Sequence, residues 1–304
     1  GGNNSSTLNW ADFEVDLSAY ADKEIYIALR HTNDASYLNM LMIDNLKLTG
    51  DAFEVFEESF VQGRGYLASY ETQTTATFTG TLNHETEFRF KDVTSYNAAQ
   101  DTASILSNFY LLGNPFTFNM NWANVVVSGV YEGYATVNEN GTYDYHTSGT
   151  INVGDGFFVQ TTADNPSVVY TQNRSRTQQE NVNLMVTAKN GSDNVIINFG
   201  GEANEGFMKL ENHNNKVAEI YVVGADGRYG IMNYDKDVET VEVFFDAKHL
   251  GSYTISALTE GEFEQVVLVD RSTGIETNLL VEDYTFTAKA EEDEGRFLVK
   301  FVNS

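Results

Sequence analysis

The sequence of 304 residues contains no cysteine. This absence excludes disulfides, thiol catalysis and metal centres with cysteine ligands. Proline occurs only 2 times, so the chain is not a proline-rich stalk. No apolar run approaches the roughly 18 residues that a membrane-spanning helix needs, and we therefore expect no transmembrane segment.

Basic residues are scarce. The chain has 18 Lys and Arg residues against 44 Asp and Glu residues, which gives a formal net charge of −26. Such a charge repels nucleic-acid phosphates and anionic membrane surfaces, so we expect no nucleic-acid partner. A solvated acidic exterior explains the charge without further function, and the binding of cations is the alternative.

Period-two alternation of polar and apolar residues replaces helical periodicity along most of the chain, and it places one set of side chains in a core. The alternating runs are residues 76–80, 87–90, 241–244 and 284–287. Turn signals that predict strand reversals are Asn140-Gly141, Asn190-Gly191, Asp226-Gly227 and Gly154-Asp155-Gly156. We therefore predict an all-β protein of tandem β-sandwich domains, jelly-roll or immunoglobulin-like, with one short helix over residues 96–109.

Three blocks are predicted from the order of strands and turns. Residues 1–50 form the first block, and residues 51–180 form a glycine- and aromatic-rich β-sandwich domain. A polar stretch over residues 171–180 indicates a linker or long loop. Residues 184–304 then form a C-terminal β-sandwich domain that ends in a strand.

The first block carries a recognisable series of motifs. Trp10 is followed by residues 15–21 (VDLSAYA), 25–31 (IYIALRH) and 42–48 (MIDNLKL). In this order they resemble the C-terminal half of the cleaved-adhesin jelly-roll domain in the haemagglutinin regions of gingipain-type proteins. The front half of that domain is missing from this sequence, which suggests that a further domain lies upstream in a longer chain.

The second and third blocks resemble the regions that follow such domains in Bacteroidetes-type surface proteins. The matching segments are residues 63–67 (GRGYL), 78–83 (FTGTLN), 111–116 (LLGNPF), 154–159 (GDGFFV), 251–256 (GSYTIS) and 268–270 (LVD). The resemblance implies a secreted protein at the outer cell surface with an adhesive or scaffolding role.

Catalytic signatures are missing from the sequence. The 5 histidines lie in no recognised motif, and there is neither a Gly-x-Ser-x-Gly elbow nor a His-Glu-x-x-His helix. Adjacent acids such as Glu57-Glu58 are expected in so acidic a chain. We therefore predict that the protein is not an enzyme, although a cleft with two facing carboxylates and a raised pKa would favour one.

Calcium is the cofactor that the residues and the resemblance both suggest, as a structural ion. Asp44 falls at the acidic position that the adhesin resemblance associates with calcium, although Asn45 stands where a second aspartate is frequent. Asp235 and Asp237, with Asn233, place oxygen ligands at alternate positions, as a hard cation requires. The alternative for each candidate is a polar loop without a metal.

Several aromatic residues lie close together in a region rich in glycine and asparagine. They are Trp122, Tyr131, Tyr134, Tyr143 and Tyr145. Exposed aromatic rings could stack on sugars, whereas buried ones would form a core, as aromatics in β proteins commonly do.

Three functions fit these observations. The first is a non-enzymatic adhesin that binds glycans or proteins of a host or neighbouring cell. The second is a structural spacer that displays an upstream domain, and the third is a carbohydrate-binding accessory of a glycan-degrading system. Exposure of the five aromatic residues would favour the first or third function, and burial would favour the spacer.

Overall fold

A computed structural model describes residues 60–67, 83, 85–98, 108–172, 179–212, 214–289 and 295–303. Contact density divides the chain into two compact units, residues 1–58 and 59–304, and the described residues all belong to the second unit. They form strands with only short 3-10 turns such as η3 (Trp122–Asn124), which confirms the all-β prediction. None of the described residues forms a helix long and apolar enough to cross a membrane.

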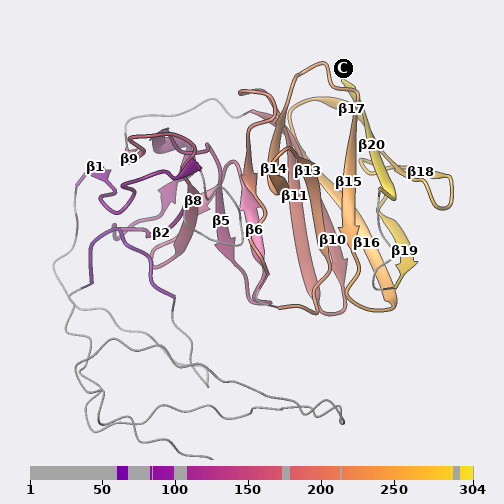
Figure 1. The fold of residues 1–304 in the computed structure, drawn as a ribbon, viewed down its shortest axis with the longest axis horizontal. Coiled ribbons are helices and arrows are strands. Elements are labelled where there is room, and N and C mark those ends of the chain that lie inside the picture. The colour runs from indigo at the N-terminus through magenta and orange to yellow at the C-terminus, as the bar shows by residue number, and fades with distance from the viewer. Residues whose placement is uncertain are drawn as a thin grey trace, which may run out of the picture. The chain divides into compact units, whose positions relative to one another are not determined.

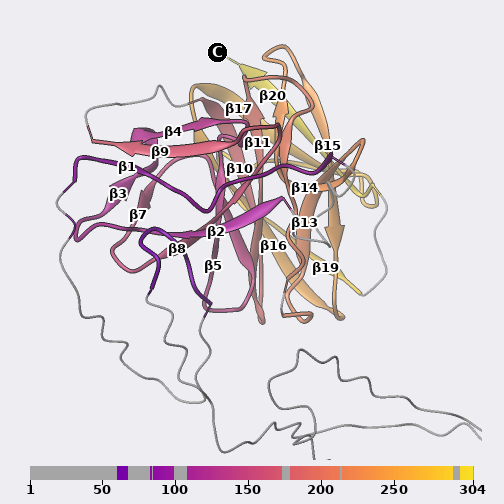
Figure 2. The ribbon, with the colours of Figure 1, turned by 60° about the vertical axis from the view of Figure 1, so that its left-hand side comes forward.

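The described residues between 60 and 172, here called the small sandwich, form two facing sheets (Figures 1 and 2). One sheet has the order β1-β9-β4 and the other β2-β8-β5-β6, with β3 and β7 as a separate pair. The strands are β1 (Glu87–Arg89), β2 (Phe109–Gly113), β3 (Met120–Asn121), β4 (Val125–Ser128), β5 (Tyr134–Val137), β6 (Tyr143–His146), β7 (Thr150–Ile151), β8 (Gly156–Gln160) and β9 (Ser167–Thr171).

The described residues between 179 and 303 form one 11-stranded sheet, here called the large sheet, in the order β18-β17-β20-β15-β13-β14-β11-β10-β16-β19, with β12 paired to β14. Its strands are β10 (Glu180–Ala188), β11 (Gly191–Phe199), β12 (Gly206–Met208), β13 (Glu219–Gly224), β14 (Gly227–Tyr234), β15 (Thr240–Asp246), β16 (Gly251–Glu260), β17 (Phe263–Asp270), β18 (Ile275–Asn278), β19 (Tyr284–Ala288) and β20 (Phe297–Asn303).

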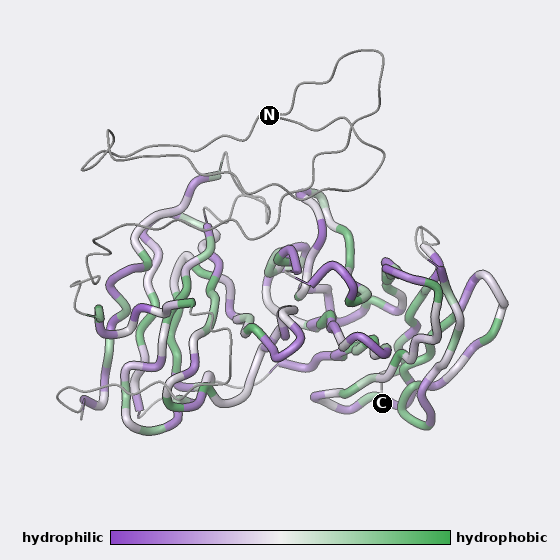
Figure 3. Tube along the Cα trace, turned by 90° about the horizontal axis from the view of Figure 1, so that it is seen from below, coloured by the Kyte–Doolittle hydropathy of each residue, from purple (hydrophilic) through white to green (hydrophobic). Residues whose placement is uncertain are grey.

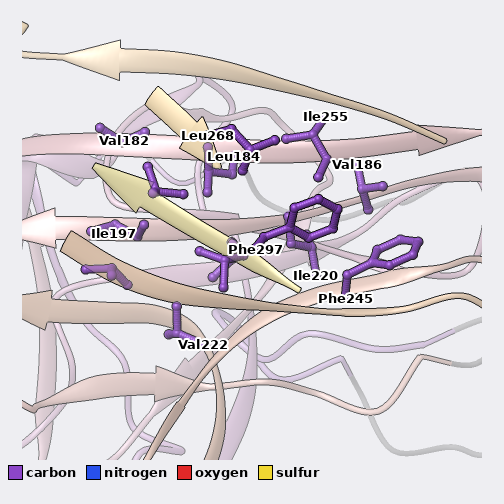
Figure 4. Packing of buried hydrophobic residues seen from close by; sticks show 14 of the residues in the cluster. Val182, Leu184, Val186, Ile197, Ile220, Val222, Phe245, Ile255, Leu268 and Phe297 are labelled. Atoms are coloured by element: carbon purple, nitrogen blue, oxygen red, sulfur yellow. The ribbon is translucent and has the colours of Figure 1, made fainter. Parts of the chain in front are cut away.

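The large sheet curls so that its two halves bury one core. Strand β13 pairs with β14 on one side and with β15 on the other, and this is where one half passes into the other. Ile197 of β11 and Phe297 of β20 both belong to this core although their strands lie in different halves of the sheet (Figure 4). Burial of these apolar side chains provides the main driving force for folding in this part of the chain.

Period-two alternation gives the four-stranded sheet of the small sandwich two different apolar faces. On β8, Phe157 and Val159 point into the core between the two sheets of the small sandwich. Phe158, between them, joins a second cluster with Ile196 of β11 and Ile231 of β14. The four-stranded sheet therefore packs against the large sheet on its outer face. Figure 3 shows the alternation as short hydrophobic and hydrophilic stretches along the traces.

Three of the four predicted strand runs lie in strands, apart from Phe90 at the end of one of them, and most of the predicted turns are confirmed. Residues 87–89, 241–244 and 284–287 lie in β1, β15 and β19, and their buried and exposed positions alternate as expected, apart from the partly buried Phe244. Asn140-Gly141, Asn190-Gly191 and Asp226-Gly227 each connect paired antiparallel strands. Gly154-Asp155-Gly156 differs, because β7 and β8 on either side of it belong to separate sheets.

The predicted helix over residues 96–109 is wrong at both described ends. Tyr96 and Asn97 have no regular structure, and Phe109 begins β2. The side chain of Asn108 accepts a hydrogen bond from the Asn97 backbone N–H at 2.8 Å and donates one to its carbonyl at 3.1 Å. In a helix over the predicted range these two residues would lie about 16 Å apart, so the hydrogen bonds between them contradict that prediction.

The first block, residues 1–50 with Asp44, lies outside the described residues, as do residues 76–80. The predicted division of the remainder into domains 51–180 and 184–304 stays a prediction. The cluster that joins Phe158 to Ile196 and Ile231 lies across that boundary.

Candidate functional site

The five aromatic residues considered for glycan binding are buried. Their exposed fractions are 0% for Trp122, 5% for Tyr131, 2% for Tyr134, 3% for Tyr143 and 1% for Tyr145. The structure therefore places them in the core, which was the alternative interpretation, and they form no exposed stacking platform. Trp122 and Tyr134 pack inside the small sandwich, and the other three pack between it and the large sheet.

Tyr145 is central to this joint between the small sandwich and the large sheet. Its backbone N–H donates to Asn194 Oδ1 at 2.9 Å, and Asn194 Nδ2 donates to its carbonyl at 3.0 Å. The amide of Asn194 thus acts as a strand partner for β6. The Tyr145 hydroxyl accepts a hydrogen bond from the Leu210 backbone N–H at 2.7 Å. Gly230 leaves space for the ring, because a Cβ there would lie 2.3 Å from it.

A buried ion pair lies beside the Tyr145 ring. Lys209 Nζ lies 2.6 Å from Asp193 Oδ2, and neither side chain is more than 4% exposed. The same ammonium lies 4.6 Å from the centroid of the Tyr145 ring and donates to the Asn194 carbonyl at 3.0 Å. Burial raises the pKa of Asp193 to about 6, although Lys209 and the backbone N–H of Ile220 oppose the shift.

The predicted calcium ligands around Asp235 do not converge. Asp235 and Asp237 are exposed on the turn after β14. Asn233 is buried within β14, and its Oδ1 already accepts hydrogen bonds from Tyr131 at 2.7 Å and from Asn198 at 2.8 Å. In the part of the chain that the structure describes, no three His, Asp or Glu side chains lie close enough to hold a metal ion. A calcium site stays a prediction, and Asp44 lies outside the described residues.

A polar cavity of about 440 Å³ opens where the small sandwich meets the large sheet. The small sandwich contributes residues from the segments before β5, after β6 and after β8. The large sheet contributes residues of β11 and β14, the turn after β11 and the residue before β10. The lining residues used below are Tyr131, Glu132, Asn198, Glu202, Glu205 and Asn233.

Amide side chains form the floor of this cavity. Asn198 and Asn233 stand opposite each other on the parallel strands β11 and β14. Asn198 Nδ2 donates to Asn233 Oδ1 and, at 2.5 Å, to Gln179 Oε1. Asn198 is 3% exposed, and its Oδ1 is buried without a hydrogen-bond partner among the described residues. A buried acceptor without a donor costs free energy, so this oxygen requires an explanation.

Carboxylates occupy the rim of the cavity from both sides. Glu132 comes from the small sandwich, and Glu202 and Glu205 come from the turn between β11 and β12. Asn233 fixes that turn, because its N–H donates to the Glu205 carbonyl at 2.8 Å and its Nδ2 donates to the Glu202 carbonyl at 3.3 Å. Gly201 in the turn has a φ of 75°, which favours glycine. The backbone of both glutamates is therefore held in place by the fold, while their side chains are exposed at the rim.

The pKa of Glu205 is raised, first by its partial burial at the rim and then by the charge of Glu202. The cavity thus contains carboxylates from two sides and one raised pKa, which is the condition under which the sequence analysis would favour an enzyme. Glu202 and Glu205 lie on the same turn, joined by the Glu205 N–H to Glu202 carbonyl bond of 3.2 Å, so they do not face each other. Only Glu132 lies across the cavity from them.

This cavity was not predicted from the sequence, although the sequence contains one signal for it. Asparagine is depleted in strands, yet Asn181, Asn194, Asn198 and Asn233 all lie within strands of the large sheet and are buried. Buried amides within a strand indicate a polar partner on that face of the sheet.

The chain matches no known protein-family model, and comparison with curated proteins and with solved structures gives no match.

Proposed function

We propose that the protein is a non-enzymatic module of an exported surface protein and works as a rigid spacer that displays an upstream domain. The resemblance of residues 1–50 to part of an adhesin jelly roll supports the surface location. Among the three functions derived from the sequence, the spacer is the one that burial of the aromatic residues favours.

The joint around Tyr145 is the single observation that carries this proposal. Three of the five aromatic residues are used to pack the small sandwich against the large sheet. Asn194 adds two hydrogen bonds to Tyr145 across the joint, and the Lys209 ammonium of the large sheet lies over the Tyr145 ring. The joint is apolar, and the backbone and hydroxyl of Tyr145 within it are hydrogen-bonded. We expect such a joint to resist bending, because domains that move relative to each other commonly share smaller and more polar contacts.

A distance measurement tests the rigidity of the joint directly. Because the chain has no cysteine, V153C and V281C allow spin labels at one exposed position on each side. We expect pulsed electron resonance to give one narrow distance distribution, which becomes broad when Tyr145→Ala is added. A distribution that is already broad without Tyr145→Ala would overturn the spacer proposal.

Binding to glycan and extracellular-matrix arrays, with calcium and with EDTA, separates the spacer from the adhesin. The spacer proposal predicts no binding in either buffer. Binding that EDTA abolishes would instead support the adhesin and make Asp44, Asp235 and Asp237 the first residues to substitute.

A glycoside hydrolase is the second candidate, and the raised pKa of Glu205 across from Glu132 is the observation in its favour. Such enzymes use one protonated and one ionised carboxyl on either side of the bond. Assay of the chain and of E205Q on a panel of aryl glycosides decides this candidate. Turnover that E205Q abolishes supports it, and absence of turnover leaves the spacer proposal alone.

A further inference from the structure

We propose that the cavity at the joint binds an organic cation with N–H donors, an ammonium or guanidinium group, between its glutamate rim and its asparagine floor. This inference goes beyond the spacer function and does not depend on it. The ligand class follows from the charge of the rim, the unmatched acceptor in the floor and the way the fold holds both in place.

The negative charge of the rim indicates a positively charged ligand. Glu202 and Glu205 line the cavity from one turn, and no Lys, Arg or His side chain among the described residues pairs with either of them. The pKa of Glu205 is raised first by its partial burial and then by the charge of Glu202, so its ionised form is disfavoured when no cation is bound. A bound positive charge would oppose this shift because it stabilises the ionised carboxylates.

The floor of the cavity contains an acceptor that lacks a hydrogen-bond donor. Asn198 lines the cavity, and its Oδ1 has no donor although the side chain is 3% exposed. Its amide cannot turn freely, because Nδ2 donates to both Asn233 and Gln179. An ammonium or guanidinium group offers several N–H donors and no acceptor, which matches an acceptor-rich cavity.

Two other ligand classes fit less well. A sugar ring needs an aromatic face, but Tyr131 is 5% exposed and its hydroxyl donates to Asn233 at 2.7 Å. A metal ion needs several ligands at short range, and in the described residues no three acidic or imidazole side chains converge in this way. A cavity of about 440 Å³ is also larger than a bare ion requires and suits a small organic group.

The site is preorganised by the fold. The turn that carries Glu202 and Glu205 is fixed to β14 by Asn233, which also receives the hydrogen bonds of Tyr131 and Asn198. Rim and floor are therefore one connected network. A ligand would have to order the exposed glutamate side chains but not the turn that carries them, and this lowers the entropy cost of binding.

The test is calorimetric titration of the full chain with agmatine, which carries both an ammonium and a guanidinium group. We expect saturable binding that E202Q/E205Q weakens by at least about ten-fold, the loss typical of charged hydrogen bonds. The matched control is E264Q/E282Q, which removes the same charge from exposed positions away from the cavity and should leave the affinity unchanged.

Two further ligands test the chemistry. Tetramethylammonium carries the charge without N–H donors and should bind at least about ten-fold more weakly than agmatine. Equal affinity for the two cations, equal loss in E202Q/E205Q and E264Q/E282Q, or tighter binding of calcium than of agmatine at the same residues would each overturn the proposal.

The cation could be a free amine or the side chain of another protein, and titration with a peptide-like lysine derivative separates these sources. Nα-acetyl-lysine methylamide represents a basic side chain within a peptide. Binding that matches agmatine and depends on Glu202 and Glu205 supports a protein side chain as the occupant. Binding of agmatine alone supports a free amine.

Discussion

Lys209 and Asp193 form a buried ion pair in which each charge compensates the burial of the other. Both side chains are almost inaccessible, and Asp193 Oδ1 has no hydrogen-bond partner among the described residues. Removing one partner leaves a buried charge, whereas replacing both by apolar residues avoids that cost.

We therefore expect Lys209→Met or Asp193→Leu alone to lower the free energy of unfolding by about 3–5 kcal/mol. The double substitution should recover most of the loss, as urea denaturation would show. The control is Lys300→Met, which breaks the exposed pair with Glu276 and should cost at most about 1 kcal/mol. Additive losses in the double variant would contradict this account.

Asp270 is shifted in the opposite direction from Asp193. Burial raises the pKa of Asp270, but hydrogen bonds from Arg296, Ser272 and Tyr284 outweigh burial and hold it well below its usual range. Arg296 binds both carboxylate oxygens, at 3.0 and 2.7 Å. A lowered pKa in the fold stabilises the protein above the unfolded pKa of about 3.9, and that contribution is lost as the pH falls further.

Asp270→Asn should destabilise the chain by about 3 kcal/mol at pH 7, because it breaks this pair. Below about pH 4 the difference from the parent protein should shrink, since the parent then loses the same interaction. Urea denaturation at pH 7, 4 and 2.5 measures both effects, with the exposed Asp283→Asn as control. A difference that stays constant with pH would exclude the assigned role of the Asp270 charge.

At the level of strands, Gly230 of β14 decides how closely the small sandwich approaches the large sheet. A Cβ at this position would lie 2.3 Å from the Tyr145 ring, inside a packed cluster that cannot move aside cheaply. The same addition at Gly156 of β8 meets Leu111 at an acceptable 3.4 Å.

Gly230→Ala should therefore cost about 2 kcal/mol through overpacking, and Gly156→Ala much less. The loss should largely disappear when Tyr145→Ala removes the ring, which a double-mutant cycle of unfolding free energies would show. If Gly230→Ala costs the same in both backgrounds, the clash with Tyr145 is not its cause.

Strands with one exposed face were predictable from the sequence, and strands buried on both faces were not. In β15, Val241 and Val243 are buried while Glu242 is exposed, so the alternation is visible in the sequence. In β11 the last seven residues are all buried, because the large sheet has its own core on one side and the small sandwich on the other. The pattern of polar and apolar residues along β11 therefore does not indicate which face of the strand is exposed to solvent.

The aromatic residues and the cavity could not be placed because their partners lie far away in the sequence. Tyr145 is buried by Gly230 and Leu210, and the cavity joins Tyr131 to Asn233. No local pattern around residues 122–145 distinguishes rings that a second sheet covers from rings that face solvent. The tendency of aromatics in β proteins to form cores was the better guide.

At the scale of the whole described unit, the shared cluster should make the small sandwich and the large sheet unfold together. In W10F the remaining tryptophan, Trp122, reports on the small sandwich, while circular dichroism reports mainly on the larger number of strands in the large sheet. We expect the two probes to give the same denaturation midpoint. Adding Tyr145→Ala should separate the midpoints, and coincident midpoints in that variant would contradict a coupling role for Tyr145.

Strand β20 lies inside the large sheet, paired with β17 on one side and with β15 on the other. Both ladders are antiparallel, and they overlap from Phe297 to Lys300, beyond which the ladder with β17 continues to Asn303. A mechanical load along this strand would therefore have to break two rows of hydrogen bonds at the same time. It could not break the bonds of a single row one after another. A module that holds another domain against shear flow at a cell surface would gain its resistance to pulling from this arrangement.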